Sequence, residues 1–162
     1  MSHWNPPLTD WEKDVTDSPS KWVAEHVRRY LASDGKSGHR WSGVNTLLLT
    51  TVGRKTGKLR RTALIYGQDG NRYLVVGSKG GSPKHPAWYL NLRDHPEVHV
   101  QVGADKFVAT AHTAAGEERY RLWGLMASIW PDYEIYQQRT SRSIPVVLLE
   151  PMAEGRRGRT SP

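Results

Sequence analysis

The first long pattern in the chain is that of an amphipathic helix. Apolar side chains recur at helical spacing from Trp22 to Leu31, and Lys, Glu and Arg occupy the opposite face. Ser18 is a suitable N-cap with Pro19 at the first helical position, and Gly35 is a suitable stop. We therefore predict a helix of about three to four turns in this segment.

The residues before this helix have a different composition. Residues 1–18 mix Pro, Asp, Ser and Thr with the isolated indoles of Trp4 and Trp11. Such a segment is typical of a mobile N-terminal arm, which could dock on the domain through its indoles. We predict a single domain over residues 19–151 and a basic C-terminal tail over residues 152–162.

Most of the remaining chain has the pattern of short strands. Six segments are apolar or β-branched and are separated by clusters of Gly, Pro, Asn and Asp. Residues 68–71, with the sequence QDGN, give a strong hairpin signal. The predicted strands are residues 46–52, 59–66, 72–78, 97–102, 106–112 and 144–149.

Two further helices are predicted between these strands, over residues 87–93 and 117–129. An aromatic segment follows Pro131. The chain has no regular alternation of strand and helix, so the pattern argues against a Rossmann sheet. The pattern predicts an α+β protein that is mainly β with helices, built on a small closed or split β-barrel of about six strands. In the second helix we expect four side chains to be buried: Tyr120, Trp123, Leu125 and Met126.

Composition narrows the class of protein. The 162 residues include no Cys, which excludes a disulfide scaffold and a cysteine–zinc site. This length predicts one domain that buries about 70% of its unfolded surface. No apolar run approaches the roughly 20 residues of a membrane span, and the first residues lack the pattern of a secretion signal. We expect a cytoplasmic protein.

The formal net charge of +7 is unevenly distributed. The segment from Arg54 to Arg61 contains five Lys and Arg residues and no acid, and residues 153–162 contain three Arg and one Glu. The loop contributes +5 and the tail +2, so the rest of the chain has a net charge of zero. A basic loop and a basic tail on a neutral domain suit a small polyanionic ligand held at one place.

The basic loop is not a phosphate-binding P-loop. That motif needs four residues between its glycines and a hydroxyl after its Lys, and residues 53–58 have neither. The two glycines would still turn backbone N–H groups outward to an anion, with Arg and Lys as charged donors. Strand alternation puts Arg60 and Arg61 on opposite faces, so we expect only one to join this group. The alternative is a solvated hairpin tip.

Two more segments are candidates for a site. The glycines of residues 77–81 would let a flat ligand approach the backbone, with Ser78 donating to its ring edge, unless the segment is a flexible connector. Trp88 could stack on that ligand or fill the barrel. Trp130, Tyr133 and Tyr136 are spaced by three and could line a substrate pocket or cover the barrel mouth.

The histidines do not indicate a metal site. His95 and His99 have helical spacing, but Pro96 and the following strand break the helix that would align them. We expect His99 and His112 on the strand surface, and no metal.

Taken together, these segments resemble the deazaflavin-dependent nitroreductase family of actinobacteria. The resemblance covers about residues 44–151, and the order of its motifs is specific. The motifs are residues 48–57 (LLTTVGRKTG), 76–81 (VGSKGG), 85–92 (HPAWYLNL), 131–137 (PDYEIYQ) and 142–146 (RSIPV). The resemblance implies an FMN-binding-split-barrel-like fold and coenzyme F420, a 5-deazaflavin with a phosphodiester and an oligoglutamate tail.

The resemblance also assigns site residues. The anionic part of the cofactor would contact Arg54, Lys55, Thr56 and Arg60, and the chain beside it would be Arg61, Thr62, Ala63, Leu64 and Ile65. The ring would contact Val76, Gly77, Ser78 and Lys79, largely through backbone groups, and Ala87, Trp88, Tyr89, Leu90 and Asn91 would close over it. The substrate would bind at Trp130, Tyr133 and Tyr136.

Three positions depart from the family's pattern. Ala63 stands where the family commonly has Pro, Ile65 where some members have an aromatic residue, and Trp130 where Tyr is frequent. The change at Ala63 weakens a preset backbone. The other two bear on the range of substrates more than on the identity of the cofactor.

The implied activity is hydride transfer from reduced F420 to a flat electrophilic acceptor: a quinone, an activated enone or a nitroaromatic. Ser78, Tyr133 or Tyr136 would stabilise or protonate the resulting oxyanion. The alternatives are an FMN-dependent split-barrel oxidoreductase and a non-enzymatic domain that binds nucleic acid. The N-terminal helix could also make a peripheral contact with the inner face of the membrane. The physiological acceptor, the oligomeric state and closure of the arm over the site stay open.

Overall fold

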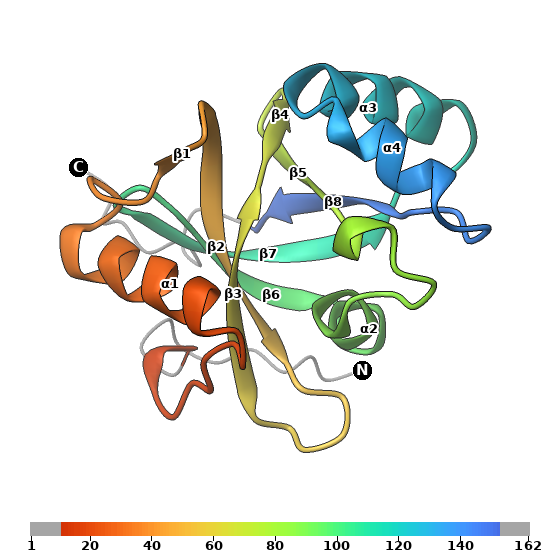
Figure 1. Ribbon diagram of the computed structural model, residues 1–162. Helices are drawn as coiled ribbons and strands as arrows, with labels where there is room; N and C mark the ends of the chain where they lie inside the picture. Colours follow the sequence, from red (N-terminus) through yellow and green to blue (C-terminus); the bar gives the residue numbers. More distant parts are fainter. Residues whose placement is uncertain (1–10, 153–162) are drawn as a thin grey trace.

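The β-branched and apolar segments form one curled antiparallel sheet in the computed structural model, which describes residues 11–152 (Figure 1). All six predicted strands are present, with bounds within a few residues of those expected. The strands are β1 (Arg40–Trp41), β2 (Val44–Val52), β3 (Leu59–Ile65), β4 (Gly67–Asp69), β5 (Arg72–Val76), β6 (Glu97–Val102), β7 (Asp105–Thr113) and β8 (Val146–Pro151).

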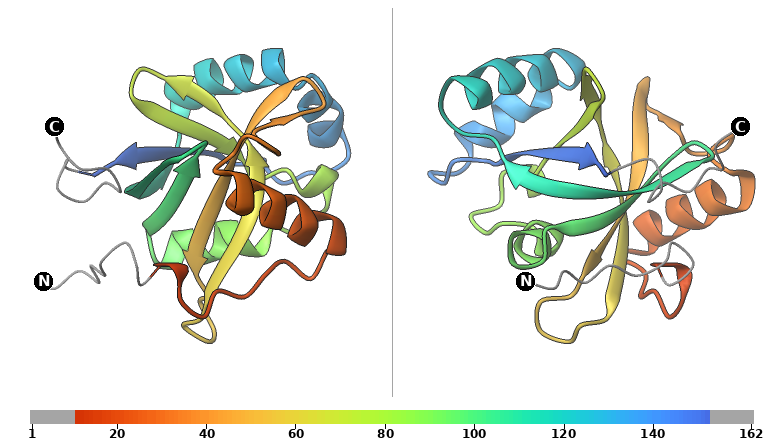
Figure 2. Two further views of the ribbon diagram at one scale, coloured as in Figure 1. Left: turned by 90° about the vertical axis from the view of Figure 1, so that its left-hand side faces the viewer. Right: turned by 180° about the vertical axis from the view of Figure 1, so that it is seen from behind.

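The helices of the described range lie outside this sheet (Figures 1 and 2). Helix α1 packs on β3, whereas α3 lies against β4, β5 and β8 with α4 beside it. Helix α2 lies against β2 and β7. The helices are α1 (Lys21–Ser33), α2 (Ala87–Asp94), α3 (Gly116–Ile129) and α4 (Asp132–Gln138), with a short 3-10 turn η2 (Lys79–Gly81).

The sheet is a barrel that does not close. Its strand order is β1-β2-β6-β7-β8-β5-β4, and β3 pairs with β2 only. Strands β3 and β4 follow each other directly in the chain, separated by Tyr66, yet β4 pairs with β5. Within the described residues no ladder joins β3 to β4 or β5, so the wall is split between them. This confirms the split barrel among the two forms that the sequence allowed.

Two buried clusters hold the layers together. The larger fills the inside of the curled sheet, and the smaller lies between the sheet and the helices α3 and α4. Each fully buried Leu, Val or Phe contributes about 1.5–3 kcal/mol of hydrophobic stabilisation. Members of the first cluster include Leu47, Leu49, Val75, Val98, Val100, Phe107 and Val147, and members of the second include Leu74, Leu122, Met126, Ile144 and Leu148.

The sequence missed the shortest elements. Strands β1 and β4 have two and three residues, too few to show an alternating pattern. Helix α4 was read only as an aromatic segment after Pro131. Pro131 is the N-cap of this helix, where the missing N–H costs no hydrogen bond, so it begins the helix. The expectation that Tyr120 is buried was wrong, because Tyr120 lies on the outer face of α3 and is 83% exposed.

The start of α1 also differs from the prediction. Ser20, not Ser18, is the N-cap, and its hydroxyl accepts a hydrogen bond from the Val23 backbone N–H at 3.5 Å. The Ser18 hydroxyl accepts from the Ser20 N–H instead, so a helix start at Ser18 is replaced by a turn. The end is as expected, since the Gly35 N–H donates to the Tyr30 carbonyl at 2.9 Å.

Part of the predicted mobile arm is packed on the sheet. The side chain of Trp11 is fully buried among Val52, Leu59 and Val108. It also lies 6.1 Å from the ring of His99, which is 3% exposed, so the expected surface position of His99 is wrong. An indole supplied by a distant segment covers this histidine. Trp4, the rest of residues 1–10 and residues 153–162 of the tail lie outside the described residues.

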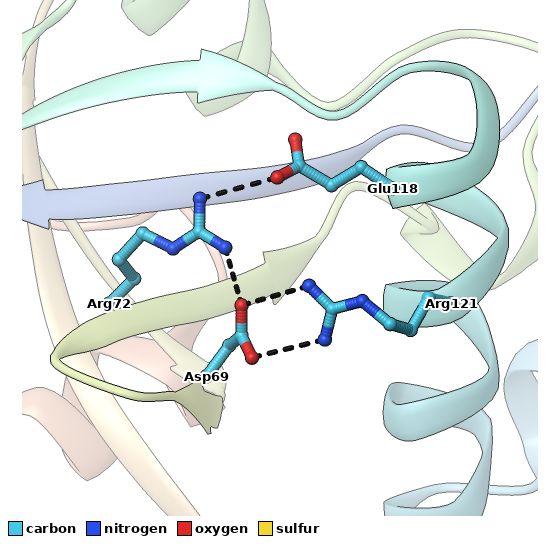
Figure 3. A network of polar contacts seen from close by, with 4 residues as sticks. All are labelled: Asp69, Arg72, Glu118 and Arg121. Carbon is cyan, nitrogen blue, oxygen red and sulfur yellow. Dashed lines mark hydrogen bonds and ion pairs between the residues drawn. The ribbon is translucent and has the colours of Figure 1, made fainter.

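Four charged side chains tie the β4–β5 hairpin to α3 (Figure 3). Asp69 accepts two hydrogen bonds from Arg121, each 3.1 Å long, and a third from Arg72. Arg72 also donates to Glu118 at 3.3 Å. The hydrogen bonds from Arg121 and Arg72 lower the pKa of Asp69 to about 2. The network therefore keeps Asp69 ionised over most of the acid range.

We predict that Asp69→Asn lowers the melting temperature slightly at neutral pH. Because the folded protein lowers this pKa from 3.8, ionised Asp69 stabilises the fold above about pH 4, and this contribution is lost as the pH falls toward 2. The difference in melting temperature between variant and wild type should narrow over that range in thermal scans. Asp94→Asn, on the exposed end of α2, is the control. A difference that stays constant from neutral to acid pH would contradict this linkage.

Candidate active site at the barrel split

The split in the barrel wall opens into an apolar pocket of about 440 Å³. Its walls come from both halves of the chain, because α1, β1 and β3 lie on one side and β5, α2 and the α3–α4 corner on the other. Most of the lining is aliphatic or aromatic. The lining residues are Trp22, Val23, His26, Trp41, Thr46, Ala63, Leu64, Ile65, Val76, Ser78, Lys79, Gly80, Pro86, Trp88, Trp130, Tyr133 and Tyr136.

The backbone edge of β3 borders this pocket. On the side away from β2, the carbonyl of Leu59 and the N–H of Arg61 bond to Thr16 at 2.8 and 3.2 Å. The next residues on that edge, Ala63 and Ile65, pair with β2 but have no strand partner on the side away from β2 within residues 11–152, and they line the pocket. The arm thus covers the first half of the edge and leaves the second half available to a ligand.

The glycine-rich segment predicted at residues 77–81 forms the far wall. Lys79, Gly80 and Gly81 have φ of 45°, 61° and 85°, so three consecutive residues are left-handed. A helical residue followed by a left-handed one, as at Ser78 and Lys79, directs successive N–H groups into one concavity. A side chain at Gly81 would lie 2.6 Å from the Tyr136 carbonyl, so only glycine permits this contact with α4.

Arg142 holds this strained segment in place. Its guanidinium donates to the backbone carbonyls of Ser78 at 2.8 Å, Gly77 at 3.1 Å and Ser82 at 2.8 Å. It also donates to Nδ1 of His85 at 3.1 Å, which places the His85 proton on Nε2. Burial and the charge of Arg142 lower the pKa of His85, which favours this neutral form. A non-glycine residue such as Lys79 costs about 1–3 kcal/mol in this conformation, and the Arg142 bonds offset that cost.

Two further hollows adjoin the apolar pocket. The Arg60 hollow, of about 200 Å³, shares Trp88 with the pocket, and the Arg54 hollow, of about 480 Å³, shares Lys79 with it. Both include Ala87, at the start of α2. The Arg60 hollow also contains Arg61, Thr62 and Asn91 beside residues 16–19 and Thr51, and the Arg54 hollow also contains Pro83, Lys84, His85, Leu90 and Arg142.

The backbone of the basic loop is organised differently from the expectation. The N–H groups of both glycines do not point outward, since Gly53 donates to Lys58 and Gly57 donates to Gly53, each at 2.8 Å. The Arg54 N–H donates to the Asn91 side chain at 3.1 Å. Closure of the hairpin consumes these donors. Any anion held here would therefore be held mainly by side chains of the loop.

The predicted site residues differ in exposure, and some of them line none of the three cavities. Arg60 is exposed, whereas Arg61 is 9% exposed and donates to the Thr50 hydroxyl and the Trp11 carbonyl. As strand alternation predicted, only Arg60 belongs to the exposed basic group. Tyr89 is buried in the barrel core and bonds to the Thr113 hydroxyl. Lys55, Thr56 and Gly77 line none of these three hollows.

The predicted aromatic group lies together at the other end of the pocket. Trp130 ends α3, and Tyr133 and Tyr136 on α4 have ring centroids 6.1 Å apart. Burial raises the pKa of Tyr133 well above its usual range, so its hydroxyl stays protonated and acts as a donor at neutral pH. Ser78 lines the same pocket, so the three predicted catalytic residues share one cavity.

Sequence reasoning missed the wall made by Trp22, His26, Trp41 and Thr46. His26 and Thr46 both bond to the Gly38 carbonyl, at 2.8 and 2.6 Å. Trp22 was assigned only to the apolar face of a helix, and Trp41 fell in a segment with no recognised pattern. The available signal in the composition is the number of Trp residues, seven in 162. Arg142 could have been found, since it begins the motif at residues 142–146.

Comparison with known proteins identifies the family. A model of the family described as F420H(2)-dependent quinone reductase matches residues 22–151. The chain belongs to this family. An F420H(2)-dependent quinone reductase of Mycobacterium tuberculosis is 41% identical over 143 aligned positions, and the match covers 80% of this chain and 96% of that protein. The resemblance inferred from the order of motifs is thereby confirmed.

Solved structures agree with this family. A structure of an F420-H2 dependent reductase is 42% identical and covers 65% of this chain and 93% of its own, with a TM-score of 0.61. A putative pyridoxamine 5′-phosphate oxidase from Listeria innocua is only 19% identical, covering 67% of this chain and 84% of its own, and its TM-score of 0.50 shows a likeness of fold. The F420H(2)-dependent quinone reductase family thus uses the split barrel described here.

We predict that Arg142→Lys keeps the charge but destabilises the segment at residues 77–85. Lysine cannot reproduce the fork of bonds to three carbonyls, and the loss should cost about 2 kcal/mol of unfolding free energy. Hydrogen–deuterium exchange should become faster in this segment, and urea denaturation should report the free energy. Arg28→Lys, on the exposed face of α1, serves as the control. Unchanged exchange of residues 77–85 would show that Arg142 does not hold them.

Proposed function

We propose that this protein transfers a hydride from reduced coenzyme F420 to a quinone. The observation that carries the proposal is the junction of one apolar pocket with two basic hollows around the start of α2. Such a site suits a ligand with a flat ring at one end and several negative charges at the other. It also leaves room beside the ring for a second flat molecule.

The residues present fit coenzyme F420. Its anionic tail would be held by the side chains of Arg54, Lys55, Thr56 and Arg60, which lie on one hairpin and its exposed edge. Of these, Arg54 and Arg60 line the two hollows. When bound, the cofactor supplies a hydride, which carries two electrons and one proton. The protein then has to bind and orient the cofactor and the acceptor, and to exclude water from the site.

Backbone groups from two walls would orient the ring. The free edge of β3 at Ala63 and Ile65 offers N–H and C=O groups along one side of the pocket, and the converging N–H groups near Ser78 and Lys79 offer donors on the other. Arg142 fixes the second wall. Trp88 lies between the apolar pocket and the Arg60 hollow and would cover the ring at that boundary.

The acceptor would bind against Trp130, Tyr133 and Tyr136. As the acceptor gains a hydride, negative charge develops on its oxygen, and a protonated hydroxyl close to that oxygen stabilises it. Tyr133 is a candidate for this donor because it lines the pocket and its hydroxyl, with a pKa raised by burial, stays protonated at neutral pH. Ser78 and Tyr136 line the same pocket and supply the other candidate hydroxyls. The apolar walls exclude water and suit a neutral ring such as a quinone.

The two alternatives receive less support. An FMN-dependent oxidoreductase shares the fold, but the family match and the relatives at about 40% identity are named for F420. A nucleic-acid-binding surface needs a basic face along the backbone path. In this chain Arg54 and Arg60 line two hollows that adjoin the apolar pocket.

The main test is a spectrophotometric assay of hydride transfer. Reduced F420 should be oxidised by a naphthoquinone in the presence of the protein, whereas reduced FMN and NADH should not serve as donors. Enones and nitroaromatics belong in the same screen. Equilibrium dialysis should show binding of oxidised F420, and failure to bind it would refute the proposed function.

The tyrosines are tested in the same assay. Tyr133→Phe combined with Tyr136→Phe should lower kcat on the order of a hundred-fold while the Kd for F420 changes little. Tyr120→Phe, whose side chain is exposed on α3, is the matched control. Full turnover by the double variant would leave Ser78 as the remaining protein donor.

A peripheral contact with the membrane remains part of the proposal. Trp22 is 58% exposed at the pocket mouth, and Lys21, Arg28 and Arg29 are exposed on the same helix. No helix of the described residues is long and apolar enough to cross a bilayer.

We predict that the protein sediments with anionic vesicles and much less with zwitterionic ones, since each Lys or Arg near an anionic surface contributes about 1 kcal/mol. Trp22→Ala should weaken this binding, and Tyr120→Ala should not. Equal sedimentation with both kinds of vesicle, or with neither, would count against the contact.

A further inference from the structure

Three indoles form a row across the mouth of the apolar pocket. The ring centroids of Trp22 and Trp41 are 5.4 Å apart, and those of Trp41 and Trp130 are 5.5 Å apart. All three side chains line the pocket. They come from the first turn of α1, from β1 and from the end of α3, so the row bridges the two sides of the barrel split (Figure 1). We call these three residues the indole row.

Trp41 is the middle member and makes both contacts in the row. The indoles of Trp22 and Trp130 are thus joined through Trp41. Its strand, β1, has two residues and pairs only with β2, through Arg40 with Asn45 and Trp41 with Val44. The side chain of Trp41 is therefore placed by a small hairpin at the pocket mouth, and no buried cluster includes it.

The base of this hairpin is nevertheless firmly held. The Thr46 N–H donates to the His39 carbonyl at 2.6 Å, and the Gly38 carbonyl accepts from the Thr46 hydroxyl and from His26 Nε2. The guanidinium of Arg40 donates to the Asn45 side chain at 2.9 Å. Because its base is anchored in this way, the hairpin holds Trp41 at a definite position, and the width of the pocket mouth is set by the protein.

The chemistry of the row favours flat neutral rings. Indoles offer large π-faces, and pairs of aromatic rings prefer offset or edge contacts at about 4.5–7 Å between centroids. The row itself carries no charge. A fused bicyclic ring entering beneath Trp41 would gain aromatic contacts that a single ring of similar polarity is too short to make.

We propose that Trp41 is a specificity-determining residue that selects fused-ring acceptors over single-ring ones. This inference rests on the proposed function, because it concerns the acceptor of the same site. It assigns to Trp41 a role in binding the acceptor, separate from the chemistry at Ser78, Tyr133 and Tyr136. It also gives a role to the two-residue strand β1, which lies outside the motifs of the family resemblance and places the side chain of Trp41 at the pocket.

The test compares two quinones that differ in the second ring. Dimethylnaphthoquinone and duroquinone both have fully substituted quinone rings, so neither adds to protein amines. Their Kd values should be measured by equilibrium dialysis with oxidised F420 present, so that no turnover occurs, and again without it. The variants are Trp41→Ala, Trp41→Leu and Trp41→Phe, with Tyr120→Ala as the control.

In Trp41→Ala, the Kd for dimethylnaphthoquinone should rise about ten-fold, which corresponds to 1.4 kcal/mol, and the Kd for duroquinone should change less than about three-fold. Trp41→Leu keeps apolar volume without a flat face and should lose the same discrimination, which guards against a folding defect in the alanine variant. Trp41→Phe should retain most of it. In assays, the KM for the naphthoquinone should rise while kcat stays nearly constant.

The outcomes separate this inference from the proposed function. Equal losses for the two quinones, or no loss for either, would overturn the role of Trp41 while leaving F420 binding and quinone turnover intact. Conversely, the Trp41 variants could change the Kd values of the two quinones as expected while the wild-type protein does not bind F420. This result would refute the proposed function alone. If Trp41→Leu kept the preference for dimethylnaphthoquinone, the apolar volume of residue 41 and not its flat aromatic face would determine the selectivity. This result would overturn the role argued here for the indole.

Discussion

The free edge of β3 is the constraint on which the site depends. A strand presents N–H and C=O groups on both sides, and within the described residues β3 has a full ladder only with β2. The chain turns away at Tyr66 and starts a new ladder with β5, so the barrel cannot close. Thr16 of the arm covers the beginning of the edge, and the rest borders an apolar pocket. The split is therefore both an unfinished sheet and the place where a ligand can bind.

Different elements cover the two sides, the mouth and the back of the split. Helix α1 covers β3 with an apolar face that includes Val27 and Tyr30, and α3 covers the opposite side with Leu122 and Met126. Neither helix reaches across the opening. The gap is spanned at the mouth by the indole row and closed at the back by the segment that Arg142 holds. The pocket is thus bounded by side chains that pack on the buried clusters, such as Trp88 and Trp130, and by Trp41, which belongs to none of these clusters.

Charge and polarity divide the site along its length. The basic side chains of Arg54 and Arg60 lie at one end, and the pocket with Tyr133 lies at the other. A polyanionic tail and a flat neutral ring need opposite environments, and the start of α2 is where these environments meet.

Much of this protein could be predicted from its sequence because the signals are local. Alternation and turn residues determined six strands, helical spacing determined α1, α2 and α3, and the motifs around Gly53, Gly77 and Trp88 determined the family. Which side chains from distant segments pack against one another was decided only by the tertiary structure. In the folded chain His99 is buried under Trp11, and Trp22, Trp41 and Trp130 form one row. The backbone N–H groups of the loop glycines form hydrogen bonds within the hairpin. The contacts of the indoles join segments distant in the chain, and neither hydrophobic period nor residue spacing carries information about such pairs.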